Sequence, residues 1–343
     1  MNLIELHILQ SFPVTCLNRD DVGSPKSATF GGIQRARVSS QSLKRATRLR
    51  ARSESAPDFQ GIRSRFLLEP FTQALLAAGM DETAAAEKAK LLCEVFSKVD
   101  AKKPDQVTTA VYLSPGEIQQ IAVAVAGGEL PEKAAKKVDR LDAADIALFG
   151  RMIANDATLN VEGAAMFSHA LSTHATANEI DFFSAVDDRK GDSEDAGAGM
   201  IGTLEFNSAT YYRYVAINLD LLFDAKHLGP IGEQEKRKSL LRAFIRSVLT
   251  AVPGARQNSM NGATLPIEVL GLSKENGQPL QLINAFEAPV KAKGKGYASS
   301  SREEMLAHHA NLKKLWGIRT AVESLLTADG LDSFLDQLLA TDV

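Results

Sequence analysis

Residues 39–52 read Ser-Ser-Gln-Ser-Leu-Lys-Arg-Ala-Thr-Arg-Leu-Arg-Ala-Arg, a pattern that predicts a basic amphipathic helix. Ser39 or Ser40 can cap this helix, because a hydroxyl accepts a backbone N–H that the first turn leaves free. At about 100° per residue, Leu43, Ala46 and Thr47 point to one side and can pack inward. The opposite face carries polar and basic side chains: Gln41, Lys44, Arg45, Arg48 and Arg52.

Positive charge is concentrated around this helix. The chain has 39 Lys and Arg against 42 Asp and Glu, yet residues 19–52 hold nine Lys or Arg and only two acids. A helix start with paired hydroxyls and a basic face can bind phosphates. A solvated basic helix is the alternative, and the commoner outcome of a charge run. The Gly31-Gly32 pair and the expected lack of acidic i,i+4 partners after Arg35 favour polyanion binding.

Composition limits the class of protein. With 343 residues, 45% of them hydrophobic and 24% charged, the chain can form one or two domains of a soluble globular protein. Two cysteines, Cys16 and Cys93, make neither a disulfide framework nor a metal-ligand set, which favours the cytoplasm. The sequence shows no signal-peptide pattern, no membrane-spanning apolar stretch and no glycine-rich nucleotide-binding motif.

The periodicity of apolar residues predicts an α+β fold. Residues 58–149 have wholly helical spacing, which indicates a helical insertion, and the polar residues 175–205 form a protrusion. Residues 10–38 are predicted to be a long, functional loop. Further helices are expected over 232–251, 301–316 and 319–340. The predicted strands cover 3–9, 161–174, 206–219 and 264–270, with 282–287 as a further candidate.

Without the two insertions, the order is strand, helix, strand, strand, helix, strand. This is the split βαβ order of a ferredoxin-like or RRM-like sheet. Such sheets often bind RNA, but the aromatic signature of a free-standing RRM is absent, so an RNA contact would use another surface. His7 is expected at the surface of the first strand rather than as a catalytic base.

Several motifs occur in order between residues 16 and 287, and in them the chain resembles the CasC-type backbone subunits of type I-E CRISPR Cascade complexes, which belong to the RAMP superfamily. The motifs are Cys16-Leu17-Asn18-Arg19-Asp20-Asp21, Phe30-Gly31-Gly32, Arg37 through Ala46, Gly150-Arg151-Met152, Ala185-Val186-Asp187-Asp188, Phe206-Asn207-Ser208, Tyr211-Tyr212-Arg213-Tyr214, Ile217-Asn218-Leu219, Val252-Pro253-Gly254-Ala255 and Asn284-Ala285-Phe286-Glu287.

The resemblance implies a hand-shaped subunit without a catalytic site, metal or cofactor. Its RRM-like palm would comprise residues 1–57, 150–174 and 206–300, with fingers over 58–149, a thumb over 175–205 and C-terminal helices over 301–343 packed on the palm. Copies would polymerise head to tail along a guide crRNA, with the thumb flipping out every sixth base. The partners implied are the crRNA, a target DNA strand, further copies, and the large, small and guide-end-capping subunits of Cascade, with no membrane.

The resemblance also assigns individual residues. Met152 matches an apolar residue that wedges against the kinked base, and Phe182-Phe183 matches an aromatic pair near the base of the thumb. Without the family, Met152 would be interpreted as a core methionine at a helix end. The positions predicted to hold the guide are Asn18, Arg19, Lys26, Ser39, Ser40, Gln41, Lys44, Arg45 and Arg48.

Two enzymes are the alternatives. Asp20-Asp21 could hold Mg²⁺ beside bound RNA and cut a paired target strand, as related type III backbone subunits do. A guide-processing endoribonuclease would need a histidine base, drawn from His7, His169 or His174. None of the three lies in a convincing catalytic constellation, and His169 and His174 lack the spacing and the carboxylate neighbours of a metal site. We therefore predict a non-catalytic scaffold.

Overall fold

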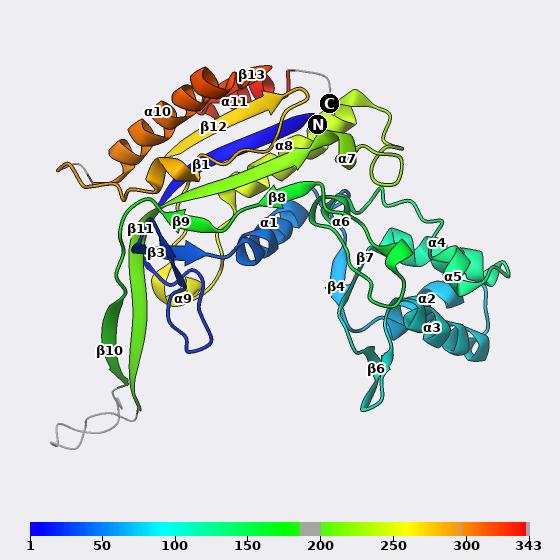
Figure 1. Cartoon of the computed structure of the whole chain (residues 1–343). Coiled ribbons are helices and arrows are strands. Elements are labelled where there is room, and N and C mark those ends of the chain that lie inside the picture. Colours follow the sequence, from blue (N-terminus) through cyan, green and yellow to red (C-terminus); the bar gives the residue numbers. More distant parts are fainter. Residues whose placement is uncertain (186–199, 295, 341–343) are drawn as a thin grey trace.

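One large sheet forms the centre of the fold. The computed structural model describes residues 1–185, 200–294 and 296–340. The strands follow the order β13-β12-β1-β11-β9-β3-β2, and β8 and β10 also pair with β11 (Figure 1). Their bounds are β1 (Leu3–Thr15), β2 (Ser27–Phe30), β3 (Ile33–Val38), β8 (Ala165–Phe167), β9 (Ala170–Ser172), β10 (Glu179–Ala185), β11 (Met200–Asn218), β12 (Glu268–Lys274) and β13 (Val322–Leu325).

The middle of this sheet has the predicted split βαβ order. β1 runs antiparallel to β11 and β12, and β11 runs antiparallel to β8 and β9. β11 therefore separates β1 from β8 and β9, which are parallel to β1. Helix α1 (Ser40–Glu54) comes between β1 and β8 in the chain, and α8 (Gln234–Thr250) between β11 and β12. The prediction of an α+β fold with an RRM-like sheet is confirmed.

Helices cover both faces of the sheet. Ile4 and Ile8 of β1 share a core with the apolar face of α8, whereas Leu9 lies in a second core with Met305 of α10 (Ala298–Trp316). Because successive strand residues point to opposite faces, both faces of β1 are buried. His7 is fully buried on the α10 side, so its predicted place at the sheet surface is wrong.

The helices α2 to α5 of the predicted insertion lie apart from the sheet (Figure 1). The buried apolar residues of the insertion form a core of their own. The prediction of wholly helical spacing is wrong, because two small strand pairs interrupt the helices, each too short to disturb the surrounding periodicity. The helices are α2 (Leu68–Ala77), α3 (Glu82–Phe96), α4 (Pro115–Ala126), α5 (Pro131–Ala134) and α6 (Ala144–Phe149), and the pairs are β4 (Ile62–Ser64) with β7 (Val111–Leu113) and β5 (Val99–Asp100) with β6 (Lys103–Val107).

The prediction of one long loop over residues 10–38 is wrong, because β1 continues to Thr15 and β2 and β3 form a hairpin. Gly31 and Gly32 make its two-residue turn with φ of +60° and +72°, values that glycine adopts without strain. A Cβ on Gly31 would lie 1.8 Å from the backbone oxygen of Glu287. Two of the motifs noted in the sequence therefore meet in space.

The C-terminal part departs from prediction in two places. Residues 282–287 contain a 3₁₀ helix, η2 (Ile283–Phe286), rather than a strand, and 319–340 is not one helix. Gly317 ends α10 with φ of +61°, and β13 then pairs with the edge of β12 before α11 begins. The remaining elements are α11 (Gly330–Leu338), η1 (Ala157–Leu159), α7 (Leu219–Leu222) and α9 (Gln257–Met260).

The predicted protrusion contains β10 and the first part of β11, a hairpin that extends away from the sheet (Figure 1). Residues 186–199 of this protrusion, with Val186, Asp187 and Asp188 of one motif, lie outside the described residues. None of the helices described is both long and apolar enough to cross a membrane.

Candidate nucleic-acid interface

Three hydrogen bonds fix the start of α1. The Ser39 Oγ accepts the N–H of Ser42 at 3.3 Å, which makes Ser39 the helix cap. The Ser39 N–H donates to Asn18 Oδ1 at 2.9 Å, and the Ser40 N–H donates to His169 Nδ1 at 2.9 Å. Burial, with smaller contributions from Arg37 and Lys26, lowers the pKa of His169, which suits a neutral ring that accepts an N–H. The position of α1 is thus set by its first turn.

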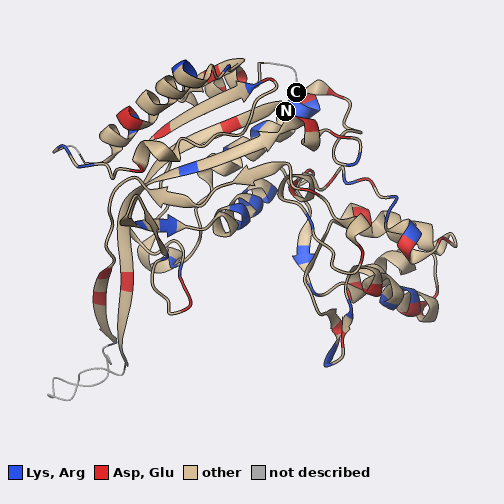
Figure 2. Cartoon of the chain, in the orientation of Figure 1, with Lys and Arg blue, Asp and Glu red and all other residues tan. Residues whose placement is uncertain are grey.

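A groove of about 860 Å³ lies where α1 meets the insertion. Among the residues that the structure describes, five cationic side chains and no carboxylate line it, so its walls favour an anion. The five are Lys44, Arg45, Arg48, Arg63 and Arg151, and the other lining residues are Gln41, Ala110, Tyr112, Phe149, Gly150, Met152, Val161 and Gly163. Figure 2 shows the basic residues gathered along α1.

The basic residues near α1 fall into two groups. Arg50 forms an ion pair with Glu54 at 2.6 Å, so the expectation of no acidic i,i+4 partner after Arg35 is wrong. The Arg52 Nε donates to the Phe59 backbone oxygen at 3.3 Å. Buried Arg35 donates to backbone oxygens of β2, β9 and the η2 region. In contrast, the groove cations Lys44, Arg45, Arg48 and Arg63 form no ion pair with any of the described residues.

Aromatic rings lie beneath two of these cations. The Lys44 Nζ is 5.7 Å from the centre of the Phe167 ring, and the Arg48 guanidinium carbon is 5.2 Å from the centre of the Tyr112 ring. Such contacts hold a cation over the ring face without neutralising it. Partial burial also lowers the pKa of Lys44. The two cations are therefore oriented by apolar surface and keep their charge for a ligand.

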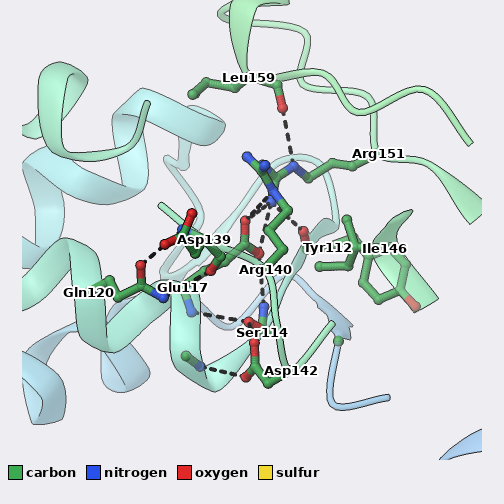
Figure 3. A network of polar contacts seen from close by, with 12 residues as sticks. Tyr112, Ser114, Glu117, Gln120, Asp139, Arg140, Asp142, Ile146, Arg151 and Leu159 are labelled. Carbon is green, nitrogen blue, oxygen red and sulfur yellow. Dashed lines mark hydrogen bonds and ion pairs between the residues drawn. The ribbon is translucent and has the colours of Figure 1, made fainter. Parts of the chain in front are cut away.

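A buried ion pair fixes the other wall of the groove (Figure 3). The Arg151 Nη1 contacts the two carboxylate oxygens of Glu117 at 2.8 and 3.0 Å, and its Nε donates to the Leu159 backbone oxygen at 3.2 Å. Glu117 also accepts from Arg140 at 2.9 Å and from the backbone N–H of Ser114 at 3.1 Å. The segment that follows Arg151 is thus tied firmly to the insertion.

Met152 projects from this segment into the groove. Its side chain is 81% exposed, whereas the neighbouring Ile153 is 3% exposed. The alternative interpretation of Met152 as a core residue is therefore wrong. Gly150 lets the chain turn here, because its φ is +80° and a Cβ would lie 2.9 Å from the Val161 backbone oxygen.

The comparisons with known proteins agree with this geometry. A family model described as CT1975-like protein matches residues 4–338. The chain belongs to the CT1975-like protein family. It is also similar to a chain of a solved structure named "CRISPR RNA-guided surveillance complex, pre-nicking", with a TM-score of 0.80 and 27% identity over 98% of this chain and 99% of that one.

A second solved structure, named "CRISPR RNA-guided surveillance complex", matches with a TM-score of 0.65 and 23% identity over 98% of each chain, which shows the fold alone. No curated protein matches. The predicted resemblance is confirmed in its coarser form, a Cas backbone protein like those of CRISPR surveillance complexes. The type I-E assignment stays a prediction.

The groove of this CT1975-like protein brings together five of the predicted site residues, Gln41, Lys44, Arg45, Arg48 and Met152. A second groove, of about 850 Å³, contains Asn18, Arg19 and the acids Asp20 and Asp21, and Arg45 lines both grooves. The Val252-Pro253-Gly254-Ala255 motif lines the second groove as well.

Other predicted residues lie outside both grooves. Lys26 is linked to Asn18 through its backbone N–H at 2.8 Å, and Ser39 and Ser40 act through the helix start described above. Phe182 and Phe183, on β10, are 67% and 40% exposed. In Figure 1, β10 and the insertion lie on opposite sides of α1.

Asp20 and the histidines of the enzyme alternatives have structural contacts. The Asp20 Oδ1 accepts the backbone N–H groups of Val22 at 3.0 Å and Ser24 at 2.9 Å, closing its own turn. His7 Nδ1 lies 2.9 Å from the Tyr212 hydroxyl, and the ring of His174 stacks on that of Tyr297 with centres 3.6 Å apart. The described ranges contain no group of three or more His, Cys, Asp or Glu that could hold a metal ion.

Four residues of the site could not be recognised in the sequence pattern: Arg63, Tyr112, Phe167 and Arg151. Arg151 lay in a recognised motif, and its place directly before the predicted wedge could have indicated a role. Arg63 and Tyr112 gave no such signal, because they lie in short strands about fifty residues apart that periodicity did not separate from the surrounding helices.

Proposed function

We propose that this protein is a crRNA-binding backbone subunit of a type I-E Cascade interference complex, a cytoplasmic ribonucleoprotein of antiviral defence. The observation that carries the proposal is the groove between α1 and the insertion, where Lys44, Arg45, Arg48 and Arg63 form no ion pair with any residue that the structure describes. Likeness to a chain of a CRISPR RNA-guided surveillance complex supports the same conclusion.

The chemistry of the groove suits a guide strand of any sequence. Contacts to phosphate fix the position of a nucleic acid and carry no sequence information. From the described part of the chain, the groove has cations, the Gln41 amide and no carboxylate, which is a set of groups for phosphate rather than for base edges. Base pairing between guide and target DNA would then do the reading, and the protein would fix only the shape of the guide.

Met152 is proposed to segment the guide. An exposed thioether beside phosphate-binding cations can insert between bases, at a cost in stacking of a few kcal/mol, and kink the strand. The β10–β11 hairpin, with Phe182 and Phe183, is proposed to act as the thumb that covers the guide beside the next copy. Repeated head-to-tail contacts that do not close give a helical filament, with six nucleotides per copy in this proposal. The large, small and guide-end-capping subunits would complete the complex.

Assembly on RNA tests the proposal. The protein is expressed with a CRISPR guide and run on a size-exclusion column, with absorbance read at 260 and 280 nm. We expect a large RNA-containing species that ribonuclease disperses. Reversing the charge of Lys44, Arg45 and Arg48 together should leave a folded monomer free of RNA. A charge-reversed protein that still forms RNA-containing filaments would refute the proposal.

The scaffold is proposed to have no catalytic role. Assembled complex is incubated with complementary RNA and Mg²⁺, and the products are separated on a sequencing gel. We expect the RNA to stay intact. Regular cuts that disappear in an Asp20→Ala variant would instead support the target-RNA endoribonuclease.

A further inference from the structure

The insertion presents one polar face of a short strand pair to the groove. Arg63 of β4 and Tyr112 of β7 are direct partners in this antiparallel pair, so their side chains lie on the same face. Both line the groove. The alternate residues Ile62 and Leu113 lie on the opposite face and line a separate, apolar groove of the insertion. The strand pair therefore has a face directed toward α1.

The Tyr112 ring is held firmly in this place. It is only 6% exposed, and a Cβ on Gly61 would lie 2.6 Å from its edge, so the ring packs directly on the β4 side of the insertion. The Tyr112 backbone oxygen accepts a hydrogen bond from Arg151 Nη1 at 3.2 Å. The same ring lies under the guanidinium of Arg48, which comes from α1. Tyr112 thus places a ring of the insertion against a cation of α1.

We propose that the insertion supplies half of the phosphate-binding groove, with Arg63 contacting the backbone of a single-stranded RNA and Tyr112 acting as the positioning residue that holds Arg48 toward the same strand. This inference rests on the proposed function and names residues of the insertion that the family resemblance did not assign.

The charge pattern of the insertion supports the role of Arg63. Arg65, two residues on, pairs with Asp100 at 2.7 Å, whereas Arg63 is exposed and forms no ion pair with a described residue. The planar guanidinium of Arg48 stacks on an aromatic face and can still donate to a phosphate from its edge. A phosphate in the groove would therefore meet one cation from each side.

Salt dependence of RNA binding tests Arg63. Fluorescence anisotropy is measured with a labelled, mixed-sequence single-stranded RNA at several salt concentrations. Because each neutralised phosphate of a single strand contributes about 0.7 to the slope of log K against log salt, Arg63→Gln should lower that slope by about 0.7. Lys90→Gln removes an exposed charge of the same insertion that lies outside the lining of both basic grooves, and it is the matched control. An Arg63→Gln slope equal to that of the control would overturn this part of the inference.

A double-mutant cycle tests Tyr112. Tyr112→Leu should weaken RNA binding about three-fold, the effect expected for one lost cation–π contact, and Tyr112→Phe should restore it because the ring is kept. In an Arg48→Gln background, Tyr112→Leu should have no further effect, because the cation that it positions is gone. A merely structural role would weaken binding equally in both backgrounds, and that result would overturn the positioning role.

Failure of the roles proposed for Arg63 and Tyr112 can be distinguished from failure of the proposed RNA-binding function. If charge reversal on α1 abolishes RNA binding but the Arg63 and Tyr112 variants behave like their controls, the proposed function stands and the insertion has no part in the groove. If the unaltered protein does not bind the single-stranded RNA, both proposals are wrong.

Discussion

Neutralising the α1 cations gives the most quantitative test of the groove. In the variant with Lys44, Arg45 and Arg48 all changed to Gln, three charges that form no ion pair with a described residue are removed while the buried face of the helix is untouched. At about 0.7 per phosphate contact, the slope of log K against log salt should fall by about two. When the salt concentration is raised four-fold, the binding constant of both proteins falls, and the fold-loss of the unaltered protein should be roughly twenty times that of the variant.

The assay is anisotropy of a labelled single-stranded RNA, repeated with unrelated sequences. The matched control changes Lys90, Lys236 and Lys314 to Gln, exposed lysines that line neither groove, so the net charge alters by the same amount. Unchanged thermal unfolding would establish that the variants are folded. Equal slopes for the groove variant and the control would refute the reasoning, because affinity would then depend on overall charge rather than on the groove.

Four further predictions concern single residues. Met152→Ala should leave thermal unfolding unchanged, because the side chain is exposed, but should flatten the periodic pattern of chemical probing on bound RNA. Glu117→Gln should destabilise the fold by about 3–5 kcal/mol in urea unfolding, because it leaves Arg151 buried without its counter-charge; a loss below about 1 kcal/mol would contradict this account. Gly31→Ala should sharply lower the yield of folded protein, since the new Cβ would overlap the Glu287 backbone oxygen. Burial, then the charges of His309 and Lys274, hold the pKa of His7 well below its ordinary value, so the unfolded chain binds a proton that the folded one does not. Stability should fall with acidification below about pH 6.5, and His7→Gln should reduce that loss in thermal scans between about pH 7 and pH 5.

Local pattern was sufficient to predict the elements that set the fold. Leu43 and Thr47 are buried on α1 as its periodicity predicts, and Ser39 caps the helix. The alternation in β1 and the order of the main strands and helices gave the split βαβ topology. These features depend on neighbours within about four residues or on the sequence of elements, so they are visible without the tertiary structure.

Which arginines are free to bind a ligand could not be predicted in the same way. Arg35, Arg48 and Arg52 are chemically identical, and they differ in what distant parts of the chain place beside them. Arg35 donates to a backbone oxygen of the η2 region, and Arg52 donates to the backbone oxygen of Phe59. Arg48, in contrast, lies over the Tyr112 ring. A run of positive charge in the sequence therefore overstates the cations available for binding.

Burial of the second face of the sheet was also not visible locally. Alternation put His7 on the face opposite Ile8, but that face is made interior by the η2 region and α10, which come nearly three hundred residues later. Similarly, β13 forms because an unpaired edge of β12 is available to residues 322–325. Without that edge, the apolar residues near the C-terminus could continue as a helix, as periodicity predicted.

Photo-crosslinking tests most directly whether the groove holds the guide. RNA containing 4-thiouridine is incorporated into the assembled complex and irradiated, and the crosslinked peptides are identified by mass spectrometry. We expect crosslinks at Gln41, Lys44, Arg45 and Arg48 and at residues 150–152, which line the groove. Crosslinks confined to other surfaces, with these peptides recovered unmodified, would contradict it.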